Sequence, residues 1–154
     1  MSSSAPAIPR RILSPIDFSN PSKSALATAT DLAKHFHAAL FLVHIVPKLP
    51  PVSGADFFRE TEYVRELQRD AEAKLRAILA PILADGVTAD SVVAVSNDTA
   101  GEILRVAEQQ HADMIVIATH GMTGWRPMIF GSIAEKITKL AHCPVLVIRA
   151  PRSE

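Results

Sequence analysis

Short apolar segments alternate with amphipathic segments along nearly the whole chain, and this alternation limits the possible folds more than any other feature. The apolar segments have the length of strands, and the segments between them carry apolar residues at helical spacing. Strands that alternate with helices form a parallel sheet with helices on both faces. We therefore predict an open five-stranded α/β sheet with strands at residues 11–16, 40–46, 91–96, 114–118 and 144–148.

The first two helices have clear sequence boundaries. Asn20 is a plausible N-cap with Pro21 at the first helical position, and apolar residues then recur at helical spacing to about residue 37. A proline-rich loop at 47–55 precedes a long helix that ends before Gly86.

The last two helices begin with residues typical of a capping box, in which two side chains satisfy the first backbone amides of a helix. Thr99 and Glu102 have this spacing at the start of the third helix. Ser132 and Glu135 repeat it at the start of the fourth, over residues 132–141. No internal repeat or long linker interrupts the pattern, so we predict one domain at 10–150 with flexible tails at 1–9 and 151–154.

Composition excludes several classes of function. Lys and Arg total 16, and Asp and Glu also total 16, so the formal net charge is zero. A protein without net positive charge lacks the electrostatic attraction to phosphates that a non-specific nucleic-acid binder needs. The single cysteine, Cys143, excludes an internal disulfide and a cysteine-rich zinc site. The longest clean apolar run, 38–43, is far shorter than the ~20 residues of a membrane helix. Residues 1–7 have neither the basic start nor the apolar core of a signal peptide, so we expect no secretion signal. We expect a soluble cytoplasmic protein that binds neither nucleic acid nor membranes.

Two segments lie beyond the carboxyl ends of predicted strands, where parallel sheets bind ligands. One is the turn at 15–19, and the other is the long connection between the fourth strand and the fourth helix. In that connection Gly121 allows close approach of a ligand, and Arg126 is the only permanent cation. Gly131 and Ser132 begin a helix, where free amides and the helix dipole favour a phosphate. Phosphate binding and helix capping both remain open for these last two residues.

Three polar side chains near these segments have alternative roles. Asp17 could hold a ribose hydroxyl or a metal ion, or its charge could interact with the dipole of the following helix. His120 could bind a phosphate, act as an acid or base, or stabilise a turn. His44 lies within the second strand and is expected to be a hydrogen-bonded core histidine.

The chain resembles the universal stress protein family over almost its whole length. The resemblance is carried by RILSPIDFS at 11–19, LVHI at 42–45 and CPVLVIR at 143–149. The ATP-binding branch of the family has the pattern G-x2-G-x9-G-[ST]. Here Gly121 and Gly131-Ser132 match its second and third glycines and its hydroxyl residue, while Ala118 replaces the first glycine.

This resemblance implies a Rossmann-like fold with strand order 3-2-1-4-5, and a homodimer that forms through the last strand. The uniformly apolar segment 145–148 fits such an interface, because an uncovered apolar edge strand invites aggregation. The resemblance also implies bound ATP, with Mg²⁺ as an accompanying ion that Asp17 could contact. The implied site consists of Pro15, Ile16, Asp17 and Ile45 around adenine and ribose, Ile117, Ala118 and Gly121 beside ribose and phosphate, and Gly131, Ser132 and Ile133 at the phosphates.

Three functions are compatible with the sequence. The leading one is a stress-response protein that binds ATP or a related adenine nucleotide as a structural or regulatory ligand. The alternative is a nucleotide-free dimeric interaction module, which Ala118 alone favours. An enzyme of the same fold is the third, but His120 and Asp17 are the only candidate bases, so at most slow ATP hydrolysis is expected.

Overall fold

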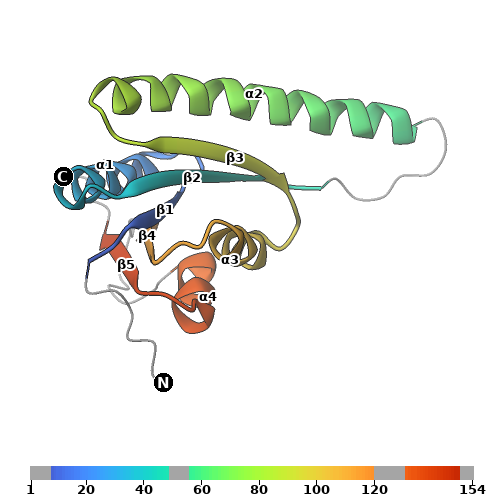
Figure 1. The fold of residues 1–154 in the computed structure, drawn as a ribbon. Helices are drawn as coiled ribbons and strands as arrows, with labels where there is room; N and C mark the ends of the chain where they lie inside the picture. The colour runs from blue at the N-terminus through green and yellow to red at the C-terminus, as the bar shows by residue number, and fades with distance from the viewer. Residues whose placement is uncertain (1–7, 49–55, 120–130, 150–154) are drawn as a thin grey trace, which may run out of the picture.

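The computed structural model describes residues 8–48, 56–119 and 131–149, and these residues form a parallel five-stranded sheet (Figure 1). The strand order is β3-β2-β1-β4-β5, as the resemblance implied. The strands are β1 (Arg11–Pro15), β2 (Ala39–Val46), β3 (Ala89–Val95), β4 (Met114–Thr119) and β5 (Val145–Arg149). Residues 1–7 of the predicted N-terminal tail, the predicted C-terminal tail and the segment that includes His120, Gly121 and Arg126 lie outside the described residues.

Helices cover both faces of this sheet (Figure 1). They are α1 (Asn20–Phe36), α2 (Asp56–Ala84), α3 (Thr99–Gln109) and α4 (Ser132–Leu140). Helices α1 and α2 pack on one face, and α3 and α4 pack on the other. None of the described helices is both long enough and apolar enough to cross a membrane.

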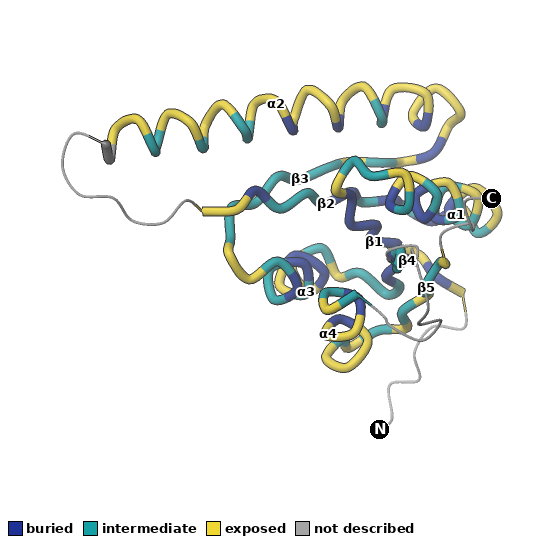
Figure 2. The backbone as a smooth tube through the Cα atoms, turned by 180° about the vertical axis from the view of Figure 1, so that it is seen from behind, coloured by how far each residue is buried: buried dark blue, intermediate teal, exposed yellow. Residues whose placement is uncertain are grey.

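The middle strand β1 separates two hydrophobic cores. Ile12 and Leu13 are both fully buried, and because side chains alternate along a strand they enter different cores. Ile12 packs with residues of α1 and α2, whereas Leu13 packs with residues of α3 and α4. Burial on both faces explains why the central strands are nearly continuous apolar runs. The exposed outer surface of α2 is visible in Figure 2.

The third strand begins earlier than its apolar run suggested. Ala89 and Asp90 already pair with Leu40 and Phe41 of β2, so β3 starts two residues before Ser91. Asp90 is exposed and polar, and an apolar-run criterion therefore missed it. Hydrogen bonding to a neighbouring strand, which the local sequence does not reveal, decides this boundary.

All three predicted N-caps are wrong by one residue. Ser19, not Asn20, caps α1: its backbone is extended and its side chain accepts a hydrogen bond from the Ser22 amide. Asp98, not Thr99, caps α3, and Gly131, not Ser132, precedes α4. An N-cap has non-helical backbone angles, and in this structure Ser19, Asp98 and Gly131 have them.

The cap of α3 explains the glycine in its first turn. The Asp98 carboxylate accepts a hydrogen bond from the Gly101 amide at 3.0 Å. A Cβ atom at position 101 would lie 2.1 Å from Asp98 Oδ2. Glycine is therefore required for this carboxylate to approach the helix so closely.

Candidate functional site

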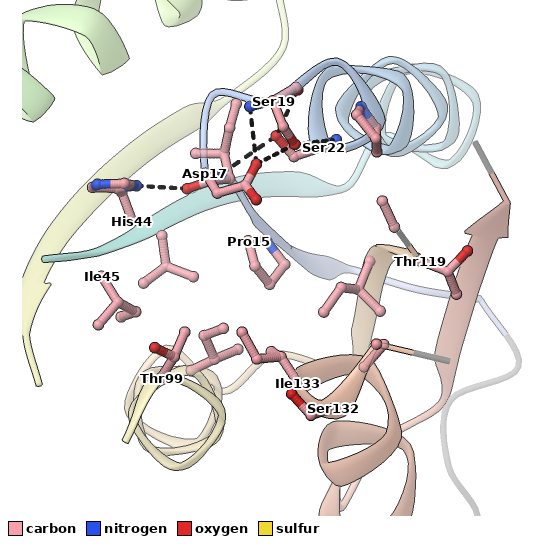
Figure 3. Close-up of a pocket in the computed structure, with 18 residues that line it drawn as sticks. Pro15, Asp17, Ser19, Ser22, His44, Ile45, Thr99, Thr119, Ser132 and Ile133 are labelled. Atoms are coloured by element: carbon pink, nitrogen blue, oxygen red, sulfur yellow. Dashed lines mark hydrogen bonds between the residues drawn. The ribbon is translucent and has the colours of Figure 1, made fainter. Parts of the chain in front are cut away.

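One cavity opens at the carboxyl ends of the strands (Figure 3). All of the predicted site residues that belong to the described part of the chain line it. They are Pro15, Ile16, Asp17, Ile45, Ile117, Ala118, Gly131, Ser132 and Ile133. Pairing of β1 with both β2 and β4 brings these segments together, although they are distant in the sequence.

The turn after β1 is held by hydrogen bonds between its own side chains. Asp17 Oδ1 accepts a hydrogen bond from the Ser19 amide at 2.9 Å and a second, short one from the Ser19 hydroxyl. The Asp17 amide donates to Ser22 Oγ at 3.3 Å, and that hydroxyl donates to the Ser19 carbonyl at 3.0 Å. Asp17 is nevertheless exposed and lines the cavity, so its position combines a local structural role with access to a ligand.

Sequence reasoning missed several lining residues from the helix starts and from β2. Thr99 lies at the first position of α3, which follows the carboxyl end of β3. The rule that ligands bind beyond the carboxyl ends of parallel strands would have indicated Thr99 had it been applied to β3 as well. The other missed residues are Pro21, Ser22, Val43, His44, Ile103 and Ala134, whereas Ser19 and Thr119 belong to the two segments that the sequence indicated as ligand segments.

His44 is a hydrogen-bonded histidine, as predicted, but it also lines the cavity. Its Nδ1 atom lies 2.7 Å from the carbonyl oxygen of Ile16. The side chain is half-buried, which sets it apart from the exposed His35 and His37 of the first helix and its C-cap.

The start of α4 has no side-chain cap. Gly131 occupies the N-cap position with φ −55° and ψ 147°, and it has no side chain with which to accept a hydrogen bond. Glu135 pairs with Lys139 at 2.8 Å, and this hydrogen bond and charge lower the pKa of the Glu135 carboxyl. The capping-box interpretation of Ser132 and Glu135 is therefore wrong. Ser132 instead lines the cavity (Figure 3).

The arrangement suits an elongated ligand that is partly apolar and partly anionic. Ile16 and Ile117 are buried walls of the cavity, and Ile45 adds a half-buried one. Hydroxyl groups of Ser132 and other lining residues surround these apolar walls (Figure 3). The N-terminus of α4 supplies backbone amides, and these favour an anion at this end of the cavity.

The cavity contains few groups that could act on a ligand chemically. Asp17 and His44 are the titratable side chains among its described lining residues. No group of three or more potential metal ligands occurs in the described ranges. A Mg²⁺ ion in this cavity would therefore need further ligands, such as phosphate oxygens of a nucleotide, besides Asp17.

Comparison with known proteins identifies related sequences and folds. The sequence model described as "Universal stress protein family" matches residues 9–149. A universal stress protein of Methanocaldococcus jannaschii is 32% identical over 146 residues, which cover 94% of this chain and 85% of that protein.

Solved structures share the fold. The universal stress protein UspA from Lactobacillus plantarum superposes with a TM-score of 0.77 at 21% identity, covering 91% of this chain and 97% of that one. A universal stress protein from Archaeoglobus fulgidus, solved in complex with dAMP, has a TM-score of 0.64 at 20% identity and covers 91% and 98% of the two chains.

Proposed function

This chain belongs to the universal stress protein family, and we propose that it binds an adenine nucleotide as a structural or regulatory ligand in a stress response. We expect this nucleotide to be ATP, accompanied by Mg²⁺ bound mainly through the phosphates. Catalysis is not part of the proposal, because the described cavity offers only Asp17 and His44 as titratable groups.

The observation that carries this proposal is the convergence of residues from separate segments on one cavity. The family resemblance implied these residues for an adenine nucleotide, and those in the described part of the chain all line the same cavity. A relative with the same fold has been solved with dAMP, which supports an adenine nucleotide as the class of ligand.

Each part of a nucleotide has a chemically suitable partner. The isoleucine walls suit the apolar faces of the base, since burying such surface contributes about 25 cal/mol per Å². The Asp17 carboxylate suits a ribose hydroxyl. The first amides of α4 and the Ser132 hydroxyl suit the phosphates. We assign His120, Gly121 and Arg126, which lie outside the described residues, to the phosphate side of the same site.

The nucleotide-free interaction module depends on Ala118. This residue lies inside β4, pairs with Ile148 and lines the cavity, so its methyl group reduces the space for a ligand. The described non-glycine residues with positive φ lie elsewhere, and Ala118 therefore needs no glycine-like backbone. One methyl group takes little space from a ligand, so we favour nucleotide binding over the nucleotide-free interaction module.

We also propose a cytoplasmic homodimer that forms through β5. This strand is the last on its side of the described sheet, and Leu146 within it is 37% exposed. An uncovered edge strand is a natural surface for pairing with a second chain. A single cysteine that forms no disulfide within the chain fits a reducing compartment.

Mass spectrometry of the ligand released by gentle denaturation of the purified protein tests the nucleotide proposal. We expect an adenine nucleotide, and calorimetric titration of ligand-free protein with ATP and Mg²⁺ should restore saturable binding. Titration with GTP under the same conditions is the control for base selectivity. If nothing is released and no heat of binding is detected, the interaction module becomes the better description. Multiple-turnover phosphate release would instead indicate an enzyme.

A further inference from the structure

We propose that His44 is a positioning residue that holds the turn between β1 and α1 in the shape that presents Asp17 to a nucleotide. This inference rests on the proposed function, since it concerns the same cavity. It adds a residue that the sequence analysis assigned only to the core.

His44 and its own strand fix the residue that precedes Asp17. The Ile16 amide donates to the Val43 carbonyl at 2.8 Å, and the Ile16 carbonyl lies 2.7 Å from His44 Nδ1 (Figure 3). A carbonyl only accepts hydrogen bonds, so Nδ1 must carry the proton. Both backbone polar groups of Ile16 are therefore bound to β2, although Ile16 lies beyond the end of β1.

His44 also contacts the residue that follows Asp17. Phe18 has φ 66°, a left-handed conformation that is unfavourable for a bulky side chain. Its ring centroid lies 4.6 Å from that of His44, and Lys74 Nζ of α2 lies 5.3 Å from the same phenyl centroid. Such a conformation persists only where surrounding contacts enforce it. The imidazole and the ammonium group provide two of these contacts, and packing against the core of α1 and α2 provides others.

Asp17 is thus flanked by two residues that both contact one imidazole. The hydrogen bonds that Asp17 accepts from the Ser19 amide and donates to the Ser22 hydroxyl order the helix start. The backbone hydrogen bond from Ile16 to Val43 ties the turn to the sheet, and His44 adds the side-chain part of that connection. If it is lost, Phe18 can relax toward ordinary φ values, and Asp17 spends less time in the orientation that binds. Apparent affinity falls in proportion to the competent fraction.

Two substitutions at His44 distinguish the effect of its hydrogen bond from the effect of its side-chain packing. His44→Leu removes the donor, whereas His44→Asn retains an N–H group close to the position of Nδ1. The matched control is His35→Leu. His35 also contacts a phenyl ring, that of Phe36 with the centroids 4.8 Å apart, but it is an exposed residue of α1 outside the cavity lining. Adenosine, ATP and inorganic triphosphate serve as probes in calorimetric titrations.

We expect His44→Leu to raise the Kd for adenosine and for ATP about tenfold, the scale of one lost hydrogen bond. His44→Asn should recover part of this loss, and binding of inorganic triphosphate should not change, because the phosphate end belongs to α4. His35→Leu should bind as the natural protein does. Equal losses in His44→Leu and His44→Asn, or an unchanged adenosine affinity, would overturn the proposal.

Hydrogen exchange separates this inference from the proposed function. If the natural protein binds no nucleotide, the proposed function fails, but the role of His44 in the turn is still measurable. We then expect the Ser19 amide to exchange about tenfold faster in His44→Leu than in the natural protein, with the middle of α1 unaffected. An unchanged exchange rate at Ser19 would show that His44 does not hold the turn.

Discussion

Lys136 Nζ of α4 lies 3.0 Å and 3.2 Å from the two carboxylate oxygens of Asp98, the residue that caps α3. One carboxylate therefore satisfies the first turn of one helix and binds the side chain of another. Thr99 and Ser132, which line the cavity, lie close in sequence to these two residues. The ion pair thereby links the start of α3 to the middle of α4, the two helices whose first residues border the cavity.

Asp98→Ala should lower the melting temperature by a few degrees, because α3 loses its cap and Lys136 loses its partner. Asp98→Asn should lower it less, since asparagine is also a good N-cap. Circular dichroism during heating measures both. Melting temperatures that are equal for Asp98→Ala and the natural protein would contradict this role.

The contribution of Asp98 to the stability of the folded protein should also depend on pH. The hydrogen bond from the Gly101 amide, followed by that from Lys136, lowers the pKa of Asp98 from 3.8. A carboxyl whose pKa falls on folding stabilises the protein above its unfolded pKa and loses this effect as pH falls through the folded value. The difference in melting temperature between the natural protein and Asp98→Asn should therefore shrink as pH drops below 3.8. Thermal melts at a series of pH values measure it.

Asp17→Ala should weaken nucleotide binding by roughly 1–3 kcal/mol, the cost of leaving a buried ribose hydroxyl without its partner. The substitution also removes the acceptor for the Ser19 amide. Asp17→Asn keeps an acceptor for that amide and is the control for the local turn. Calorimetric titration with ATP measures both variants. Unchanged affinity in a folded Asp17→Ala protein would refute the contact with the ligand.

Ala118→Gly should improve ATP affinity by about 1 kcal/mol, because it removes a methyl group from the cavity wall without requiring a new backbone conformation. Gly131→Val should abolish binding, since its side chain would cover the amides at the start of α4. Titration of the natural protein and both variants with ATP measures the two effects. Binding by Ala118→Gly alone would show that this methyl group closes the site.

Leu146→Lys should weaken the homodimer. Leu146 is the exposed apolar residue of β5, whereas Val147 packs against the core of α3 and α4 and would report on folding as well as on association. Sedimentation velocity at micromolar concentration measures the dimer. A monomeric natural protein would exclude this assembly. Leu83→Lys, at an exposed leucine of α2, is the control for a general loss of apolar surface.

Cys143 should react slowly with iodoacetamide at neutral pH. Partial burial, with a smaller effect from the Asp113 charge, raises the pKa of its thiol above 9.0, so little thiolate is present. The alkylation rate should increase with pH and be much faster in urea. Rapid alkylation of the folded protein at pH 7 would contradict the raised pKa of this thiol.

Local sequence determined the class of fold and most of the element positions. Apolar runs such as 40–46, set between amphipathic segments, are typical of strands in a parallel sheet that helices cover on both faces. The family resemblance supplied the strand order and the candidate residues. Residues close in sequence, such as Pro15, Ile16 and Asp17, could be assigned together because one turn contains them all.

Tertiary structure decided what depends on contacts between distant segments. Ser132 and Glu135 form no capping box, because Gly131 occupies the N-cap position and Glu135 pairs with Lys139. Spacing alone cannot choose between neighbouring cap positions or between two partners within one helix. Thr99 and His44 line the cavity because β2 and β3 end at the same edge of the sheet as β1. Strand neighbours are set by long-range hydrogen bonding, and no local pattern encodes which side chains two such strands bring together.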